Sequence, residues 1–255
     1  MKITRVPVEV ATRAPTGSTN AYVVGENPAV LVDPAARTDA LDDAVAGRGV
    51  EHVAVTHTHP DHVGAVAHYA DALDATTHAR YGRTDLFAAA TGVDADETFR
   101  EGTTFADVTV VDTPGHAVDH VAFAADDAVL CGDLAVAAGS VVVGHPEGDL
   151  RAYLTALRRL HAMAPDVLHP GHGSTIENPR GTCERLIAHR LDRERAVLNA
   201  VRNGADAIPA ITDAAYEKDV SDVRDLAEAT VHAHVQKLVH EGRVHWERGH
   251  VRLTT

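Results

Sequence analysis

The chain has 255 residues and a mass of 27.0 kDa, long enough for one large domain or for a domain with a small appendage. Its hydrophobic content of 45% suits a globular core, but no apolar run approaches the ~20 residues that a transmembrane helix needs. The formal charge of −14 indicates a hydrated acidic surface, and two cysteines are too few for a disulfide framework.

The acidic charge is unevenly distributed. Residues 181–255 carry 11 Lys/Arg and 12 Asp/Glu, a net of −1, while residues 1–180 carry the remaining 12 and 25, a net of −13. An acidic partner-binding surface is one interpretation; the other, which we favour, is a halophilic composition, in which dense carboxylates keep the surface hydrated at high salt. Met1-Lys2-Ile3-Thr4 leads directly into an alternating strand pattern rather than a signal peptide, so we expect a cytoplasmic protein.

The first 180 residues alternate short β-rich runs with helical stretches, which predicts an α/β domain over residues 1–180. The strands are expected at Lys2–Val10, Ala21–Gly25, Ala29–Asp33, His52–Thr56, Ala75–His78, Val108–Asp112, Val121–Ala125, Ala128–Cys131 and Val167–Leu168. The helices are expected at Thr38–Ala46, Asp61–Ala72 and Leu150–Met163.

After Pro179 the pattern changes to helices followed by a hairpin. Helices are expected at Cys183–Val201, Ile208–Glu217 and Leu226–Glu241, and Arg243–Leu253 is typical of a hairpin that turns at Arg248-Gly249. This order is that of a winged helix, so residues 181–255 are predicted to form a small winged-helix-like domain.

The stretch His57-Thr58-His59-Pro60-Asp61-His62 places four metal-type ligands within six residues. His57 and His59 lie two residues apart at the end of a strand, so both imidazoles are expected to point the same way. Asp61 and His62 lie where the next helix begins. Such a set can hold two divalent ions about 3.5–4 Å apart.

Three further segments each place a candidate ligand just after a predicted strand, where α/β folds carry their ligand sites. They are Thr113-Pro114-Gly115-His116, Cys131-Gly132-Asp133 and Pro170-Gly171-His172-Gly173. The glycine before Asp133 is expected to permit a close approach of the backbone.

Taken in chain order, this motif set resembles that of the metallo-β-lactamase superfamily. The resemblance implies an αβ/βα sandwich. It also implies that His57, His59 and His116 bind one metal ion, that Asp61, His62 and His172 bind a second, and that Asp133 bridges them.

A narrower set of motifs is similar to the beta-lactamase-like protein 2 branch, which carries a C-terminal winged helix. These motifs are Thr113-Pro114-Gly115-His116 with Asp119-His120, Pro146-Glu147-Gly148-Asp149, and His189-Arg190 with Arg193-Glu194. The eukaryotic member of that branch is an endoribonuclease that acts on single-stranded RNA. The resemblance also implies a homodimer.

Nitrogen and oxygen ligands without a thiolate suit Zn²⁺, and Mn²⁺ or Fe also match. Between two such ions, the pKa of a bridging water falls from 15.7 toward ~7, which supplies hydroxide at neutral pH. We expect Asp61 to orient or deprotonate this water, and His120 to contact the substrate or to act through a hydrogen bond. His145 and His169 are candidate substrate-binding residues near the mouth of the site.

The metal site alone does not choose among an ester, a thioester, a lactone and a phosphodiester. The two enzyme hypotheses are therefore a hydrolase of RNA phosphodiesters and a thioester or ester hydrolase of the hydroxyacylglutathione-hydrolase (glyoxalase II) type. A third hypothesis is a winged-helix DNA-binding regulator with a structural metal site. Against it, the expected recognition helix carries Lys237 but no arginine, so the sequence argues against sequence-specific DNA as a partner.

Overall fold

The computed structural model describes residues 1–254 and divides into two compact units. The first contains residues 1–113, 119–141 and 163–182, and the second contains residues 114–118, 142–162 and those from 183 onward. Neither unit is a continuous segment of the chain. The predicted domain boundary between residues 180 and 181 stays a prediction.

The first unit contains a six-stranded sheet in the order β1-β2-β3-β4-β5-β6. β1 to β3 are antiparallel neighbours, whereas β3 to β6 run parallel. The strands span Ile3–Glu9, Ser18–Gly25, Ala29–Val32, Val50–Ala54, Thr76–Arg80 and Glu97–Phe99. Because β3 to β6 are parallel, the residues that follow them all lie at one edge of the sheet.

A second, five-stranded sheet has the order β11-β10-β9-β8-β7. Its strands, from β7 to β11, span Thr104–Phe105, Val108–Asp112, Val121–Ala125, Ala128–Gly132 and Val167–Pro170. β9 and β10 form the predicted hairpin across Asp126-Asp127, and β11 pairs parallel with β10. The predicted α/β fold class is confirmed.

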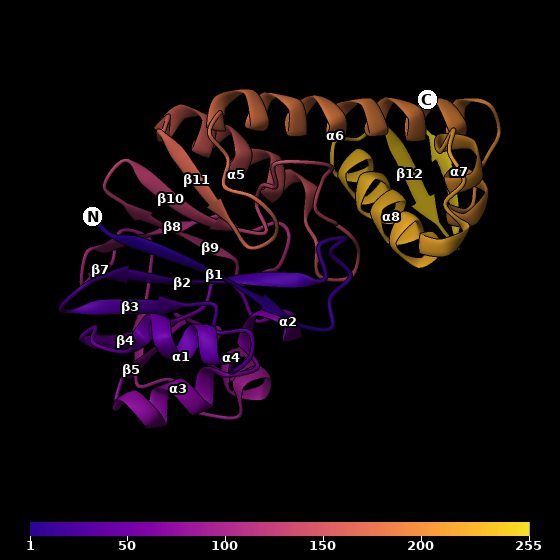
Figure 1. Cartoon of the computed structure of the whole chain (residues 1–255). Coiled ribbons are helices and arrows are strands. Elements are labelled where there is room, and N and C mark those ends of the chain that lie inside the picture. The colour runs from indigo at the N-terminus through magenta and orange to yellow at the C-terminus, as the bar shows by residue number, and fades with distance from the viewer. Residues whose placement is uncertain (255) are drawn as a thin grey trace. The chain divides into compact units, whose positions relative to one another are not determined.

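Both faces of the first sheet are buried. Successive residues of its strands point to opposite sides, so neighbouring residues belong to different cores. Tyr22 and Val24 of β2 belong to a core that also contains Val110 and Phe123 of the second sheet. Val23, between them, belongs to a separate core formed with the helices α1, α3 and α4. These helices, at Asp39–Val45, Val66–Leu73 and Thr84–Thr91, cover the outer face of the first sheet (Figure 1).

The prediction of one helix over Asp61–Ala72 is wrong, because the chain forms α2 at Pro60–Val63 and then α3 from Val66. The break lies at Ala65, whose backbone N–H donates to the carbonyl oxygen of Pro34 at 2.8 Å, outside the helix. Beside it, Gly64 packs so closely that an added Cβ would lie 2.5 Å from the carbonyl oxygen of Ala35. The short α2 thus keeps its own direction, and it carries Asp61 and His62.

Three elements of the first unit were not predicted. β6 and β7 contain three and two residues, too few to show an alternating pattern. α4 buries Phe87 on its apolar side. The predicted strand His52–Thr56 begins at Val50 and ends at Ala54, so His57 lies in the loop that follows.

The second unit contains α7, a short 3₁₀ helix, α8 and the hairpin β12–β13, together with most of α5 and of α6. Their bounds are Leu150–Met163 for α5, Pro179–Arg202 for α6, Ile208–Ala215 for α7, Ser221–Val223 for the 3₁₀ helix, Arg224–His240 for α8, Val244–Glu247 for β12 and His250–Leu253 for β13.

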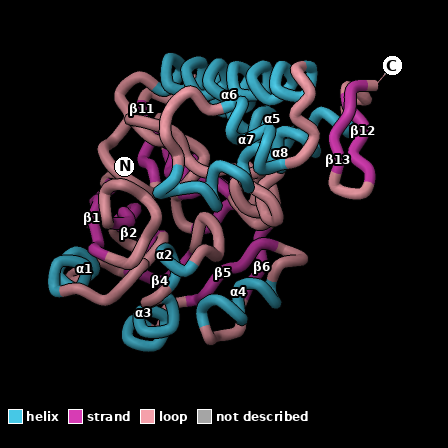
Figure 2. The backbone as a smooth tube through the Cα atoms, turned by 90° about the vertical axis from the view of Figure 1, so that its right-hand side faces the viewer, coloured by secondary structure: helices cyan, strands magenta, loops and turns pink. Residues whose placement is uncertain are grey.

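An apolar cluster joins α6, α7, α8 and the hairpin, with members such as Val197, Ile211, Val235 and Val251. The predicted order of helices followed by a hairpin is confirmed (Figure 2). A winged-helix identity stays a prediction. None of the helices in the described part of the chain combines the length and apolarity needed to span a membrane.

Candidate metal centre

The loop after β4 and the start of α2 present the first group of predicted ligands. His57 is buried three residues after β4, His59 is the N-cap of α2, and Asp61 and His62 lie within its single turn. Pro60 at the first helical position fixes the backbone angle that begins the helix. The four side chains are therefore carried by one short segment, the loop after β4 and the start of α2.

Loops from distant parts of the chain bring Asp133 and His172 to the same place. His57, His62 and Asp133 each offer a donor atom within 4.8 Å of the others, and so do Asp61, His62 and His172. Asp133 follows β10 and His172 follows β11, which are paired strands. Six of the seven predicted ligands lie in this first unit.

The two carboxylate oxygens of Asp133 face different histidines. Oδ1 lies 3.8 Å from Nε2 of His62, and Oδ2 lies 3.4 Å from Nε2 of His172. Nε2 of His172 is also 3.5 Å from Oδ2 of Asp61. A carboxylate in this position can contribute one oxygen to each of two ions.

Hydrogen bonds orient the rings of His62 and His172. Nδ1 of His62 donates to Oδ2 of Asp33 at 3.0 Å, and Nδ1 of His172 donates to the carbonyl oxygen of Ser18 at 2.8 Å. In the neutral ring, each Nε2 then carries the lone pair that a metal ion requires.

His57 is oriented through Thr56. The hydroxyl of Thr56 donates its only proton to Asp33 at 2.8 Å, so it accepts a hydrogen bond from Nδ1 of His57 at 3.0 Å. This leaves the lone pair of His57 on Nε2, which lies 3.0 Å from Nδ1 of His59. The two nitrogens therefore meet on one side of the site.

The electrostatics of the centre favour a cation. Burial alone would lower the pKa of His62, but the charge and hydrogen bond of Asp33, with Asp133 and Asp61, raise this pKa to about 9. For His172, burial likewise lowers the pKa while Asp133 raises it, with a net increase. The carboxylates thus hold a positive charge here, which protons or metal ions can supply.

The donor set also fits a metal ion by its hydrogen bonding. Nε2 of His62 is fully buried and has no hydrogen-bond partner among the described residues. A buried nitrogen of this kind costs free energy unless a ligand satisfies it. Imidazole and carboxylate donors without thiolate suit Zn²⁺ and also Mn²⁺ or Fe.

Two glycines make room for the ligands, as predicted for the one before Asp133. Gly132 has a φ of +47°, and a Cβ there would lie 2.7 Å from Thr56. At Gly171 a Cβ would lie 2.6 Å from Oδ1 of Asp133 and 2.8 Å from Cε1 of His62. Any side chain at Gly171 would thus occupy the space between two ligands.

His116 lies in the loop 114–118, which belongs to the second unit. Its Nδ1 donates to the carbonyl oxygen of Val142 at 2.7 Å, which leaves the lone pair on Nε2. The tautomer therefore suits a metal ligand, and its predicted role stays a prediction.

His120 is completely buried, and both of its ring nitrogens bind protein groups. Nδ1 lies 2.8 Å from the hydroxyl of Thr113, and Nε2 accepts a hydrogen bond from the backbone N–H of Asp133 at 3.0 Å. Its ring thereby positions the Asp133 backbone. The alternative of a substrate contact stays a prediction.

The two candidate substrate-binding histidines lie in different units. His145 is exposed in the second unit, with its ring stacked on His232 at a centroid distance of 3.7 Å. His169 is half-buried on β11 beside Tyr22, at a centroid distance of 5.5 Å. Burial and the charge of Arg5 lower the pKa of His169.

Two supporting residues were missed from the sequence. Asp33 is buried at the end of β3 with a φ of +52°, and it accepts hydrogen bonds from both Thr56 and His62. Thr12 donates its hydroxyl hydrogen to Asp61 at 2.5 Å. A carboxylate directly after a buried strand was a signal for Asp33, whereas nothing in the sequence around Thr12 marks it.

Comparison with known proteins agrees with this geometry. The family model described as the metallo-beta-lactamase superfamily matches residues 14–172. A Drosophila melanogaster protein named beta-lactamase-like protein 2 homolog is 30% identical over 253 residues, covering 89% of this chain and 84% of that protein. An Aspergillus fumigatus atrochrysone carboxyl ACP thioesterase is 31% identical over 199 residues, covering 72% of this chain and 60% of its own length.

Solved structures share the fold. A metallo-beta-lactamase family protein from Thermus thermophilus has a TM-score of 0.79 at 22% identity, with 98% of both chains covered. A protein solved in a di-iron-bound form is 30% identical with a TM-score of 0.56, covering 71% of this chain and 97% of that one.

Proposed function

The chain belongs to the metallo-beta-lactamase superfamily, and from this premise we propose that it is a binuclear metal-dependent hydrolase that cleaves RNA phosphodiesters. Metal-dependent hydrolysis is the activity that the family and its named relatives support. The observation that carries the proposal is the pair of donor groups that share His62, one with Asp61 and His172 and the other with His57 and Asp133.

Asp61, His62 and His172 would hold one ion, and His57 and His59, completed by His116 through the family resemblance, would hold the other. The two oxygens of Asp133 suit it to join them. Bound divalent ions supply a hydroxide nucleophile at neutral pH and polarise the substrate oxygen. Zn²⁺ is the proposed metal, with Fe as the alternative because a similar structure is di-iron-bound.

The protein groups position and accept protons. Asp61 would orient the attacking water and accept its proton, and the hydroxyl of Thr12 holds the carboxylate of Asp61 in place. His120 would fix Asp133 through its backbone N–H. RNA as the substrate rests on the resemblance to the beta-lactamase-like protein 2 branch, whose Drosophila relative covers most of this chain.

The second candidate function is hydrolysis of a thioester, because the Aspergillus relative is named as a thioesterase. Pure, metal-loaded protein incubated with single-stranded RNA, and separately with an acyl thioester, distinguishes the two. We expect the RNA to be cleaved, and an Asp61→Asn variant to lose this activity. Intact RNA together with a consumed thioester would reject the RNA assignment.

We also propose that α6 to α8 with the hairpin form a winged helix that supports a homodimer or guides substrate, in a cytoplasmic protein. If instead the chain is a DNA-binding regulator, the unsubstituted protein and the Asp61→Asn variant should bind a specific DNA sequence with equal affinity. Neither protein should then turn over RNA or a thioester.

A further inference from the structure

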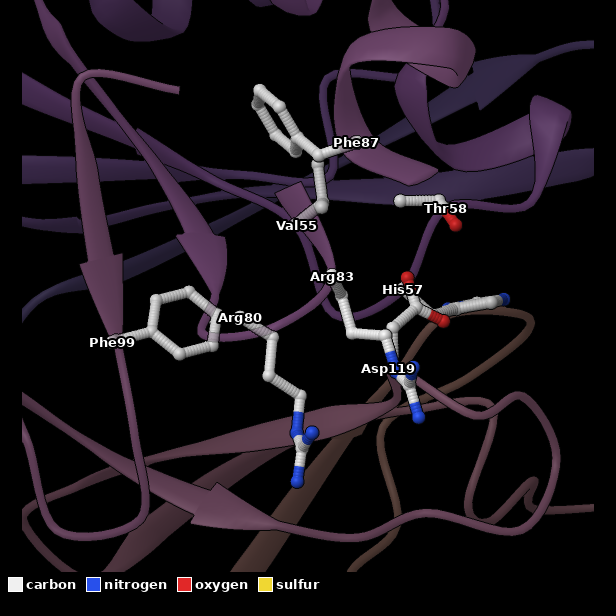
Figure 3. Close-up of a pocket in the computed structure, with 8 residues that line it drawn as sticks. All are labelled: Val55, His57, Thr58, Arg80, Arg83, Phe87, Phe99 and Asp119. Carbon is white, nitrogen blue, oxygen red and sulfur yellow. The ribbon is translucent and has the colours of Figure 1, made fainter. Parts of the chain in front are cut away.

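A small pocket adjoins His57 within the first unit. Its lining consists of apolar and charged side chains together (Figure 3), namely Val55, His57, Thr58, Arg80, Arg83, Phe87, Phe99 and Asp119. Arg80 is the last residue of β5, Arg83 lies in the loop that follows it, and Asp119 lies in the loop after β8. Since β4 and β5 are parallel neighbours, their ends place this pocket beside the metal ligands at the same sheet edge.

Asp119 is the unusual member of the lining. Its side chain is buried, with 5% of its surface exposed, yet it makes no hydrogen bond or ion pair with any described residue. Its carboxylate oxygens are not among the fully buried polar atoms that lack a hydrogen-bond partner, so they are open to the pocket that they line, where they can accept a hydrogen bond. A ligand in the pocket can provide the donor of this bond.

The two arginines of the pocket differ in their partners. Arg80 forms two hydrogen bonds with the carboxylate of Asp112, at 3.1 and 2.7 Å, which neutralises it. Arg83 is exposed, and its guanidinium has no ion-pair partner in the described part of the chain. The pocket thus offers one unpaired acceptor in Asp119 and one unpaired cation in Arg83.

We propose that this pocket is a ribose-phosphate subsite, in which Asp119 accepts a hydrogen bond from a 2′-hydroxyl and Arg83 binds the neighbouring phosphate. A ligand with one hydroxyl donor and one anionic group satisfies both side chains at once, whereas a simple anion would be repelled by Asp119. The 2′-hydroxyl is also the group that lets a protein distinguish RNA from DNA. This inference rests on the proposed function. It predicts that the preference for binding RNA rather than DNA depends on Asp119.

An exposed aromatic ring directly follows Arg80 of the pocket in the sequence. Tyr81 is 53% exposed, and the guanidinium carbon of Arg100 lies 3.4 Å from its ring centroid. β5 ends at Arg80, which pairs with Phe99 at the end of β6, so both residues follow paired strands. Single-stranded nucleic acids are held by stacking of bases on such rings and by basic groups on the backbone.

The test compares the binding of RNA and of DNA by the protein and by variants of its pocket residues. Metal-loaded protein in an Asp61→Asn background, which keeps the strand intact, is titrated with a labelled 12-nucleotide single-stranded RNA and with the same sequence as 2′-deoxy strand. We expect the unmodified pocket to bind the RNA about 10-fold more tightly than the DNA. Asp119→Ala should remove this preference by weakening RNA binding while leaving DNA binding unchanged.

Arg83→Ala should weaken both strands alike, by about 3- to 10-fold, and should reduce the slope of log affinity against log salt by about 0.7. Arg83→Lys should restore most of this affinity. Arg37→Ala, an exposed arginine paired with Asp42, is the matched control and should change neither.

An equal affinity for RNA and DNA with Asp119 intact, or an RNA preference that survives Asp119→Ala, would overturn the subsite. These outcomes are independent of turnover. If RNA is bound with the expected dependence on Asp119 but is not cleaved by the unsubstituted protein, the proposed function fails while the subsite stands.

Discussion

At the scale of single residues, Asp33 connects the two halves of the metal centre. Its carboxylate accepts hydrogen bonds from Thr56, which orients His57, and from Nδ1 of His62. Asp33→Asn removes the charge that fixes both rings, so we expect metal affinity to fall by about 10- to 100-fold. Metal titration with a competing chelator measures this.

The control for Asp33 is Asp43→Asn, at an exposed position of α1. Equal metal affinity of Asp33→Asn and the unsubstituted protein would show that these hydrogen bonds do not support the ligands. The measurement does not depend on substrate identity, and it therefore tests the centre separately from the RNA proposal.

A second residue-scale prediction concerns His78, which is buried and stacked on Phe105 at a centroid distance of 4.3 Å. Burial, and then the charge of His52, lower its pKa to about 4, although Asp96 opposes this shift. The folded protein thus takes up a proton less readily than the unfolded chain, whose histidine pKa is about 6.5. His78 therefore contributes stability above pH 6.5, and this contribution is lost as the pH falls toward 4.

We expect the free energy of unfolding to be about 2 kcal/mol lower at pH 5 than at pH 7 because of His78 alone. Urea denaturation at both values measures the difference. His78→Gln keeps a donor toward His52 at 3.0 Å but cannot titrate, so its difference between the two pH values should be smaller. An unchanged difference would mean that other groups, such as the nearby Glu97, determine the acid sensitivity.

At the scale of elements, the loops after β10 and β11 bring Asp133 and His172, the last two predicted ligands in the chain, to the metal centre. β10 and β11 are parallel partners, so Asp133 and His172 leave the sheet at the same edge. Gly171 permits this approach because a Cβ there would lie 2.6 Å from Asp133 and 2.8 Å from His62.

Gly171→Ala should therefore lower the metal content of the purified protein by at least about 10-fold, since the methyl group displaces two ligands. Elemental analysis measures the content. Gly173→Ala is the control: its φ of +82° predicts backbone strain, but a Cβ there would make only an ordinary contact with Thr16, at 3.8 Å. If both variants lose metal equally, loop strain rather than displacement of the ligands is the cause.

At the scale of the whole molecule, the charge of −14 determines the response to salt. Repulsion between carboxylates opposes the compact state, and salt screens it. We expect stability to increase by about 1–2 kcal/mol between 0.1 M and 2 M KCl, which corresponds to about 2–4 °C in Tm for each kcal/mol. Sucrose at equal osmolality is the control, because it strengthens burial without screening charge. An equal rise in sucrose would reject screening as the cause.

The sequence by itself determined the α/β class, most strands, and a metal-binding motif that the family model also matches. These features are local: alternation of side chains marks a strand, and His57 to His62 are six consecutive residues. The same local rule fails where an element is too short for a pattern, as in β6 and β7, and where a hydrogen bond from Ala65 to Pro34 divides one predicted helix.

Only the tertiary structure decided which groups meet. Asp33 and Thr12 are ordinary polar residues in the sequence, and they become supports of the centre because β3 lies beside β4 and because Thr12 reaches Asp61. The pairing of Arg80 but not Arg83, and the burial of Asp119 without a partner, likewise depend on contacts between distant segments. A sequence pattern reports the face of an element, whereas a binding site depends on which faces pack together.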